Sequence, residues 1–450
     1  MLPAKAQLRH FLAQIISDKE RQGHVTAGLL DELAKLPERY DALDAFAHRL
    51  ATLPLRPDWP YVEPNKLDDV WDECDPNRPL KSLKTFKPAD ISERAGFAFL
   101  SSVCGCILGK PLEVNPTLAQ IRQAAEKVGE WPLRDYVSEA MLVALRRRHG
   151  DAVDTTRETI RYVAADDDIN YTLLGMLMIE KYGIQFTQNQ LQHLWIANLP
   201  VGWCWGPERS INIKAGLRLL GKDSRPDPFE EWGSVWNPGD ELDGALIRAD
   251  AYGYACAGNP ALAAELAWRD ASLTHRRTGI YGTMFAAAAI ATAFAVEDPL
   301  EIFVIANQFV PRKSRFHAVV EDSIQRVRAA GNWIEGYEAV HNQYKEYDQG
   351  RIYQEIGTVI NTLQFAKDVG HGICMQVSQG NDTDSFGCTA GSILGAFFGP
   401  GHLEARWYKP FNDTIHTTLA EFHEQKLSEV IRRMGALPGR VTAELAGEKQ

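Results

Sequence analysis

The chain has 450 residues, and its 59 Asp and Glu side chains outnumber its 48 Lys and Arg, which gives a formal net charge of −11 at pH 7. This acidic balance argues against broad binding to nucleic acid or to anionic membranes, because both attract basic proteins. The length exceeds one typical domain and leaves room for a single large domain with an appendage.

The sequence has no uninterrupted apolar stretch long enough to span a membrane. Its first residues, MLPAKAQLRHFLAQIISDKER, have the spacing of an amphipathic helix and not the pattern of a signal peptide. The seven cysteines are scattered without a Cys-x-x-Cys pair, so we expect reduced thiols in the core. These features predict a cytoplasmic protein that does not enter a membrane.

The N-terminal region differs in pattern from the rest of the chain. Residues 1–53 carry the apolar periodicity of several amphipathic helices. The stretch 53–64, LPLRPDWPYVEP, is too rich in proline for a helix or a central strand. We predict an extended segment whose Trp59 and Tyr61 pack across the main domain, and we assign residues 1–89 to an N-terminal extension.

A helix of small residues follows the extension. Residues 92–113, SERAGFAFLSSVCGCILGKPLE, predict such a helix, which ends at the Gly-Lys-Pro sequence. Gly105 and Gly109 lie one turn apart, so we expect another helix to pack closely against this face. Glu113 follows the helix, and the alternative for this residue is a surface carboxylate.

Further helices are predicted over 116–129, 135–149 and 155–164, before a cluster of three acidic residues, Asp166, Asp167 and Asp168. Adjacent carboxylates repel one another unless they are well solvated or share a cation. The cluster opens an apolar helix, so the sequence predicts either a cation site or a strongly acidic helix start.

The middle of the chain offers aromatic candidates for a pocket. Trp203 and Trp205, with Glu208, predict either the wall of a substrate pocket or buried anchors of a loop. The insert 221–243 is polar and rich in Pro and Gly, which predicts a surface loop. The apolar segment 280–296 predicts an interior helix.

A second acidic turn lies within residues 380–399, GNDTDSFGCTAGSILGAFFG. Asp382 and Asp384, with Ser385 beside them, offer the oxygen ligands that Mg²⁺, Ca²⁺ or Mn²⁺ prefers. The alternative is a helix cap, because Asp and Ser also favour helix N-termini. The small residues that follow predict a central helix that another backbone can approach closely.

The remaining segments predict helices near 299–309, after Pro311 and over 333–366, with a final helix at about 413–433 and a frayed tail. Strand signals are nearly absent, and the sequence therefore predicts an all-α fold.

Taken together and in this order, DDDINYT and GNDTDSFGCTAGSILGAFFG resemble the two metal-binding motifs of the ADP-ribosylglycohydrolase family. The family consists of all-helical enzymes with a binuclear magnesium centre. GCILGKPLE is similar to the family's first motif. The resemblance spans roughly residues 90–435, which we assign to a catalytic domain, with residues 436–450 as a tail.

The resemblance implies specific roles for the matched residues. Two Mg²⁺ ions, for which Mn²⁺ is a possible substitute, would be held by Asp166, Asp167, Asp168, Asp382, Asp384 and Ser385. The candidates for proton transfer are Glu113, Asp166 and Asp384. The residues expected to line an ADP-ribose pocket are Gly244, Ala245, Arg248 and His275.

Alternatives remain for the last two residues and for the function. Arg248 is also suited to a buried ion pair with Asp250 or Asp270, and His275 to a capping or core position. The resemblance implies hydrolysis of an N- or O-linked ADP-ribosyl group, with ADP-ribose or an ADP-ribosylated acceptor as the binding partner. The alternatives are a metal-dependent hydrolase of another ribosyl compound, such as a nucleoside or nucleotide, and a non-catalytic relative.

This chain departs from the family pattern at three positions. Cys106 stands where many members have Asp, and Ile169 replaces the last Thr of the usual Thr-Asp-Asp-Thr motif. Asp166 replaces the first Thr of the same motif, and the extra carboxylate would raise metal affinity or accept a proton from water. Cys106 and Ile169 are the features that favour a non-catalytic relative, and the sequence makes no prediction of oligomeric state.

Overall fold

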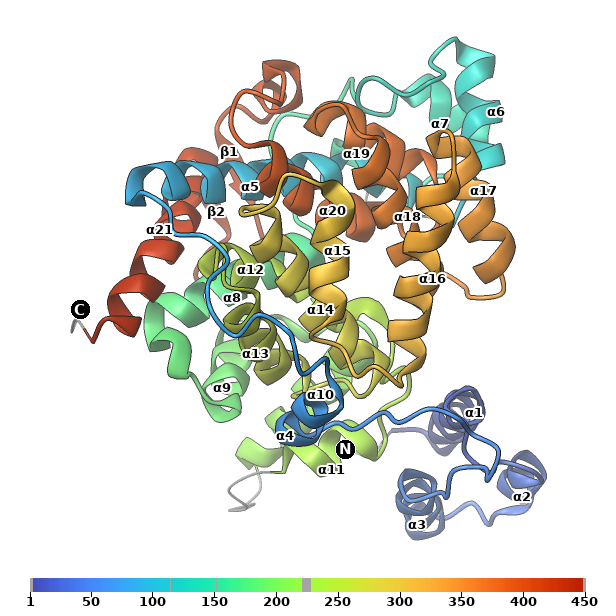
Figure 1. Ribbon diagram of the computed structural model, residues 1–450. Coiled ribbons are helices and arrows are strands. Elements are labelled where there is room, and N and C mark those ends of the chain that lie inside the picture. The colour runs from blue at the N-terminus through green and yellow to red at the C-terminus, as the bar shows by residue number, and fades with distance from the viewer. Residues whose placement is uncertain (1–2, 114, 151, 221–227, 448–450) are drawn as a thin grey trace.

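The computed structural model describes the chain in four stretches, residues 3–113, 115–150, 152–220 and 228–447. Within these stretches the regular structure is helical apart from one small antiparallel sheet (Figure 1). The sheet pairs β1 (Thr414–His416) with β2 (Glu424–Lys426). The predicted all-α class is therefore confirmed.

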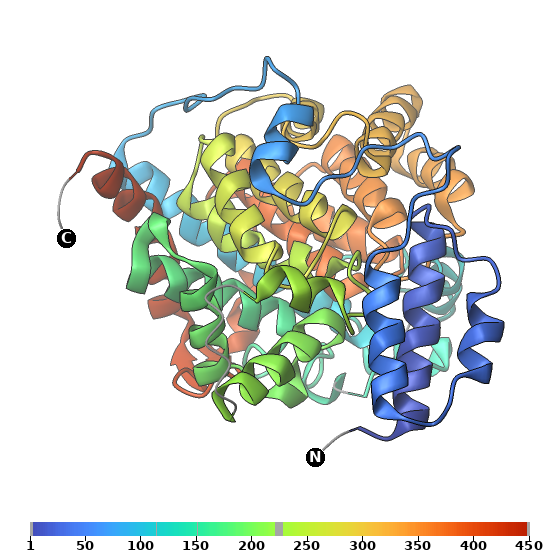
Figure 2. The ribbon, with the colours of Figure 1, turned by 90° about the horizontal axis from the view of Figure 1, so that it is seen from below.

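Three N-terminal helices form a small bundle beside the larger helical body (Figures 1 and 2). They are α1 (Lys5–Arg21), α2 (Leu29–Lys35) and α3 (Tyr40–Ala51). The bundle has its own apolar core, to which Leu12, Ile16, Leu43, Phe46 and Leu50 contribute. The predicted amphipathic helices are thus present and bury their apolar faces against one another.

The proline-rich segment crosses from this bundle onto the larger body, as predicted. The Trp59 ring lies over Gly23, with the guanidinium of Arg315 5.5 Å from the ring centroid. Glu63 forms an ion pair of 2.8 Å with the same arginine. The segment is therefore fixed to the main domain by both aromatic and ionic contacts.

The larger body begins with the following helices, where η marks a 3-10 helix: α4 (Leu67–Glu73), α5 (Pro88–Gly109), η1 (Lys110–Leu112), α6 (Leu118–Val128), α7 (Glu139–Leu145), η2 (Ala152–Asp154), α8 (Asp167–Tyr182), η3 (Gly183–Gln185), α9 (Gln188–Asn198), η4 (Val201–Trp203) and α10 (Gly206–Leu220). It continues with α11 (Phe229–Ser234), η5 (Asp243–Arg248), α12 (Asp250–Ala255), α13 (Pro260–Ala271), α14 (Thr278–Ala293), α15 (Pro299–Asn307), α16 (Arg315–Ala329), α17 (Trp333–Tyr344), α18 (Tyr353–Phe365), α19 (Val369–Ser378), α20 (Thr383–Phe398), η6 (Ala405–Trp407), η7 (Lys409–Phe411) and α21 (Leu427–Leu445).

Helices α5 and α20 form the centre of the body and pack along each other (Figure 1). The stretch Pro88–Leu112 is long and apolar enough to cross a membrane, but 89% of its apolar window is buried within the fold. A Cβ atom on Gly105 would lie 2.0 Å from the carbonyl oxygen of Gly387, and one on Gly391 would lie 2.4 Å from that of Ser101. The close helix packing predicted from these small residues is therefore confirmed.

We expect Gly105→Ala to destabilise the protein by about 3 kcal/mol, because the added methyl group forces α5 away from α20. Denaturant unfolding followed by circular dichroism measures this loss. Gly216→Ala is the matched control, since a Cβ at this helical position meets open space and should stabilise by about 0.5–1 kcal/mol. Equal effects of the two substitutions would contradict the packing account.

Two predicted helices differ from the structure. Residues 155–164 form turns, because Thr156 and Thr159 use their hydroxyl groups to bond each other and the local backbone. The final helix begins at Leu427 and not near residue 413, because Asn412 and Asp413 adopt positive φ angles that turn the chain into the β1–β2 hairpin.

The predicted C-terminal tail also needs correction. Helix α21 continues to Leu445, so the division expected at residue 435 falls inside a helix. The insert 221–243 is only partly described, since residues 221–227 lie outside the described stretches. Its later part contains α11, in which Phe229 and Trp232 are buried, so this part is not the surface loop that was predicted.

Candidate active site

The two acidic turns begin two helices that meet at the C-terminal end of α5. Asp166 caps α8, where its Oδ1 atom accepts a hydrogen bond of 3.0 Å from the backbone N–H of Asp168. Asp382 precedes α20 but makes no side-chain capping bond there. The Thr383 hydroxyl donates to the carbonyl oxygen of Gly109 at 2.8 Å. The helix-cap alternative therefore holds for Asp166 but not for Asp382.

Carboxylates from five parts of the chain converge at this point. Within each of three groups, potential ligand atoms lie within 4.8 Å of one another: Glu113 with Asp382 and Asp384, Asp166 with Asp167 and Asp168, and Asp243 with Glu355 and Asp382. Ser385 joins the first two groups, because its hydroxyl donates to Asp168 Oδ2 at 3.3 Å. All the residues predicted to hold metal are thus brought together.

The protein leaves some of these carboxylate oxygens without a partner. Among the described residues, Asp168 Oδ1 and Asp384 Oδ1 are buried and accept no hydrogen bond. The two residues are only 1% and 2% exposed. A buried unpaired carboxylate is costly unless it is protonated or bound to a cation. The all-oxygen donor set therefore fits a hard divalent ion such as Mg²⁺ or Mn²⁺.

The pKa values of these carboxylates report the same crowding. Burial, followed by repulsion from neighbouring acids, raises the pKa of Asp168, Asp382 and Asp384 well above the usual range. Burial and the charge of Asp384 raise the pKa of Glu113 to about 10. Burial and Asp166 raise that of Asp167 to about 8. The protein alone thus compensates little of the negative charge in this cluster.

Asp166 is the exception, because it has a cationic partner. Lys110 Nζ donates to Asp166 Oδ2 at 2.6 Å, and both side chains are buried. Burial acts to raise the pKa of Asp166, but the charge of Lys110 and the hydrogen bonds from Lys110 and Asp168 together outweigh burial, and the pKa is lowered. Burial likewise acts to lower the pKa of Lys110, but the charges of Asp166 and Asp384, with the hydrogen bond to Asp166, together raise it. The pair is therefore charged on both sides.

A cavity of about 270 Å³ opens above the acidic cluster. Glu113, Asp167, Asp382 and Ser385 line its floor, and its walls include Tyr171, Trp205, Glu208, Asp243, Gly244 and Gln349. The indole of Trp205 is half exposed and lies against the guanidinium of Arg209. The sequence left two predictions for the aromatic loop, a pocket wall or a buried anchor. Trp205 therefore fits the first of them, a pocket wall.

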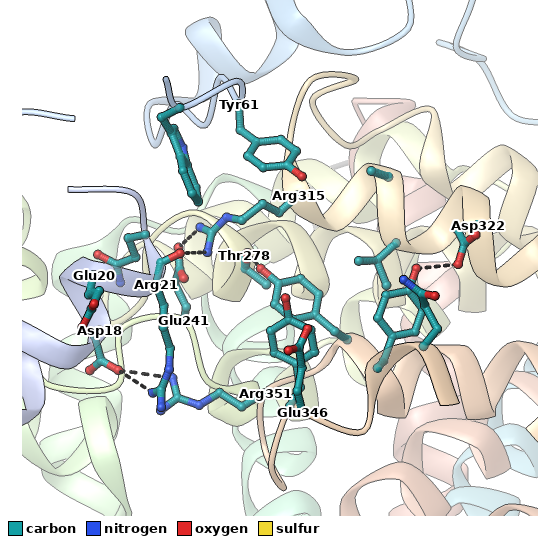
Figure 3. A pocket seen from close by; sticks show the side chains of 18 of the residues that line it. Asp18, Glu20, Arg21, Tyr61, Glu241, Thr278, Arg315, Asp322, Glu346 and Arg351 are labelled. Atoms are coloured by element: carbon teal, nitrogen blue, oxygen red, sulfur yellow. Dashed lines mark hydrogen bonds and ion pairs between the residues drawn. The ribbon is translucent and has the colours of Figure 1, made fainter. Parts of the chain in front are cut away.

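A larger cavity, of about 700 Å³, lies between the N-terminal bundle and the main body (Figure 3). Two of its arginines, Arg315 and Arg351, are paired with acids of the same cavity. Arg315 bonds Glu241 at 2.6 Å, and Arg351 bonds Asp18 at 3.2 Å. The Arg351–Asp18 pair in this cavity connects the N-terminal bundle to the main body. The unpartnered carboxylates, in contrast, lie under the smaller cavity.

Three of the residues predicted to line the pocket, Arg248, His275 and Ala245, do not line the described cavity. Arg248 is 1% exposed, and its guanidinium donates to Asp270, Glu208, Thr274 and the carbonyl oxygen of Gly244. The alternative of a buried ion pair with Asp270 is thus the arrangement observed, and the contact of Arg248 with ADP-ribose stays a prediction.

His275 is completely buried, and its Nδ1 atom lies 2.7 Å from the Thr274 hydroxyl. Burial, with the nearby charge of Arg248, lowers its pKa well below the usual range. Ala245 is also buried, so Gly244 is the one member of this predicted set that lines the described cavity. His275 and Ala245 therefore lie outside the lining of this cavity, and their contact with ADP-ribose stays a prediction.

The departures from the family pattern are packed in the core. Ile169 is 1% exposed, and Cys106 is fully buried and faces Cys388. All seven cysteines are buried and unbridged, as the sequence predicted. Burial raises the pKa of Cys106, so this side chain adds no charge where many family members have Asp.

Sequence reasoning missed three charged residues of the site. Lys110 was treated only as part of a helix end, and Asp243 as the last residue of a polar insert. Glu355 lies in an ordinary amphipathic helix, and its oxygens accept the backbone N–H groups of Gly350 and Ile352. Burial raises the pKa of Asp243 to about 7 and that of Glu355 to about 8. The adjacency of Asp243 to Gly244 was the available signal, whereas Glu355 offered none.

Fold and site together define an all-helical protein with a buried, carboxylate-lined centre that fits a hard cation. The model of the ADP-ribosylglycohydrolase family matches residues 87–436, which is most of the chain. This chain therefore belongs to the ADP-ribosylglycohydrolase family, whose members are typically hydrolases and commonly depend on a metal.

The chain is also similar to a solved structure described as an ADP-ribosylglycohydrolase-related protein complex. The two share 17% sequence identity and a TM-score of 0.52, and the match covers 78% of this chain and 99% of the other. At this identity the likeness supports the fold alone. None of the curated proteins matches the chain.

Proposed function

We propose that this protein hydrolyses an N- or O-linked ADP-ribosyl group and releases ADP-ribose and a free acceptor. The observation that carries the proposal is the set of buried carboxylates, with unpartnered oxygens on Asp168 and Asp384, beneath a cavity open to a substrate. Membership of the ADP-ribosylglycohydrolase family supplies the substrate class.

The metal would be held by Asp167, Asp168, Asp382, Asp384 and Ser385. When bound, Mg²⁺ orients hydroxyl groups and lowers the pKa of water, which supplies a nucleophile near neutral pH. The protein's own acids act on the sugar, because cleavage at the anomeric carbon builds positive charge on the ribose ring. Carboxylates fixed near that charge stabilise the transition state.

Glu113 is the proposed proton-transfer residue for the leaving group. It lines the cavity beside Asp384 but is only partly buried, so a bound acceptor can reach it. Trp205 offers an aromatic face at the cavity wall, and Glu208, held by Arg248, offers an acceptor for ribose or adenine donors. These residues would orient the nucleotide while the carboxylate floor holds the ribose.

Calorimetric titration with ADP-ribose tests the substrate class. We expect binding in the presence of Mg²⁺ that disappears with chelator, since the unpartnered carboxylates need the cation to bind hydroxyl groups. Binding that chelator does not affect would contradict the role assigned to the acidic turns. A matched titration of the Asp384→Ala variant separates loss of the metal centre from non-specific effects of chelator.

A second candidate is a hydrolase of a smaller ribosyl compound, such as a nucleoside. The cavity of about 270 Å³ lies just below the range of about 300–1,000 Å³ usual for ligand pockets, and this favours a compact ligand. Titrating free nucleosides and ADP-ribose in parallel distinguishes the two candidates. Tighter binding of nucleosides, together with ribose release from them, would replace the first proposal.

We expect Glu113→Gln to lower the rate of ADP-ribose release by about 10²–10⁴-fold, because it removes a proton-transfer group and keeps the side-chain shape. Binding of ADP-ribose should be retained, so the effect appears in kcat. Glu421→Gln, at an exposed position, is the control and should leave the rate unchanged. A Glu113→Gln variant with full kcat would exclude Glu113 from proton transfer.

A further inference from the structure

Lys110 is a buried cation among the acids of the site, at the point where the sequence expects only a helix end. Its ammonium group lies 2.6 Å from Asp166 Oδ2, and the two side chains are 4% and 0% exposed. Lys110 is the first residue of η1, directly after α5, and so comes from a different part of the chain than either acidic turn. The ammonium group therefore bridges the C-terminal end of α5 to the start of α8.

Both oxygens of Asp166 are engaged within the protein. Oδ2 accepts from Lys110, and Oδ1 accepts from the backbone N–H of Asp168. The carboxylate and the ammonium neutralise each other, so Asp166 brings no net negative charge to a metal ion. This contrasts with Asp168 and Asp384, each of which keeps one buried oxygen without a partner among the described residues.

The positive charge of Lys110 extends beyond Asp166. The potential ligand atoms of Asp166, Asp167 and Asp168 lie within 4.8 Å of one another, so the ammonium group bonded to Asp166 stands beside the whole first acidic turn. An ammonium group in this place supplies the kind of charge compensation that a cation supplies. It also repels any divalent ion placed close to Asp166, because like charges repel strongly where water is excluded.

We propose that Lys110 takes the place of one of the two metal ions expected for the family, so that this chain binds a single divalent cation. That ion is held within the set already proposed, Asp167, Asp168, Asp382, Asp384 and Ser385, and the Lys110–Asp166 pair fills the second position. The inference deepens the proposed function, because it rests on the same metal centre. The substitution of Asp for Thr at position 166 and the buried lysine then form one paired feature of this chain.

The test is the stoichiometry of Mn²⁺ binding, measured by calorimetry and by elemental analysis of the dialysed full-length protein. We expect one Mn²⁺ per chain, with the resolved hyperfine electron paramagnetic resonance spectrum of an isolated ion. Lys110→Ala frees Asp166 and should raise the stoichiometry to two, with the spectrum broadened by coupling between neighbouring ions. Lys110→Arg keeps the charge and should stay at one.

A second variant protects the test against misfolding. Lys110→Ala leaves a buried carboxylate without its partner, which is strongly destabilising. The double variant Lys110→Ala/Asp166→Thr removes both charges and should fold, which circular dichroism checks, and it should also bind two ions. Two Mn²⁺ in the unaltered protein, or one Mn²⁺ in every folded variant, would overturn the inference.

The outcome is distinguishable from that of the proposed function. Two ions together with release of ADP-ribose would overturn the role of Lys110 and leave the hydrolase proposal standing. If the unaltered protein binds one ion, the variants bind two, and ADP-ribose is not released, the result would support the role of Lys110 and contradict the hydrolase proposal.

Discussion

Replacing Asp384 by Asn is expected to lower the rate of ADP-ribose release by at least ~10³-fold while the fold is retained. Losing one oriented electrostatic group costs about 10²–10³-fold in rate. This change also weakens the whole metal centre, so we expect a loss at or above the upper end of that range. Asp384 belongs to one of the three carboxylate groups, and its Oδ1 atom has no partner among the described residues. The amide keeps the size of the side chain but removes its negative charge.

The measurement is the rate of ADP-ribose release at saturating Mg²⁺, with thermal unfolding as the check on the fold. Asp72→Asn, on the exposed face of α4, is the control and should leave both quantities unchanged. We expect Asp384→Asn to unfold at the same temperature or higher without metal, because a crowded buried acid has been neutralised. Full activity of this variant would exclude the proposed metal centre from catalysis.

Replacing Arg248 by Met is expected to lower the free energy of unfolding by about 3–5 kcal/mol, the usual cost of removing one partner from a buried ion pair. Arg248 lies between Asp270, at 2.6 Å, and Glu208. Without the guanidinium, both acids are left buried and uncompensated, and Gly244 loses the bond to its carbonyl oxygen.

Denaturant unfolding measures this effect, with two controls. Arg432→Ala, in an exposed pair with Glu429, should leave the free energy of unfolding nearly unchanged, because solvent screens such a pair. A triple variant in which Arg248, Glu208 and Asp270 all become neutral should recover much of the loss, since no buried charge is left unpaired. A loss in Arg248→Met no larger than that in Arg432→Ala would mean that this arginine does not organise the site.

The fold was largely predictable because its signals are local. The small residues of α5 and α20 indicate a close helix pair, and the acidic turns indicate helix starts with clustered carboxylates. These patterns act within one or two helical turns, which a sequence displays directly. The hairpin near residue 414 was not predictable, because it depends on two residues with positive φ at Asn412 and Asp413.

The site was predictable only in part, because its members come from distant segments. Each acidic turn contains its own motif, but Glu355 is recruited from a helix with no distinguishing pattern. Arg248 and His275 are in the right neighbourhood, yet burial and hydrogen bonding direct them away from the cavity. Whether a polar residue faces a cavity or supports it from behind depends on packing between helices, which a single sequence does not encode locally.

Lys110 illustrates the same limit. Its neighbours in sequence, Gly109 and Pro111, indicate a helix end, and the lysine itself resembles an ordinary solvated residue. Its partner Asp166 lies in a different segment, and only the folded chain brings the two side chains to 2.6 Å. The pairing of these two side chains therefore becomes visible through the structure.

The most direct measurement is the release of ADP-ribose from an ADP-ribosylated peptide, followed by chromatography with Mg²⁺, after chelation and after Mg²⁺ is restored. We expect release with Mg²⁺, no release after chelation and full recovery on restoration, with Asp384→Asn inactive throughout. Release at an undiminished rate in chelator would contradict a metal-assembled ADP-ribosyl hydrolase. Absence of release from all linkages, in a protein that binds Mg²⁺ and is folded, would contradict it equally.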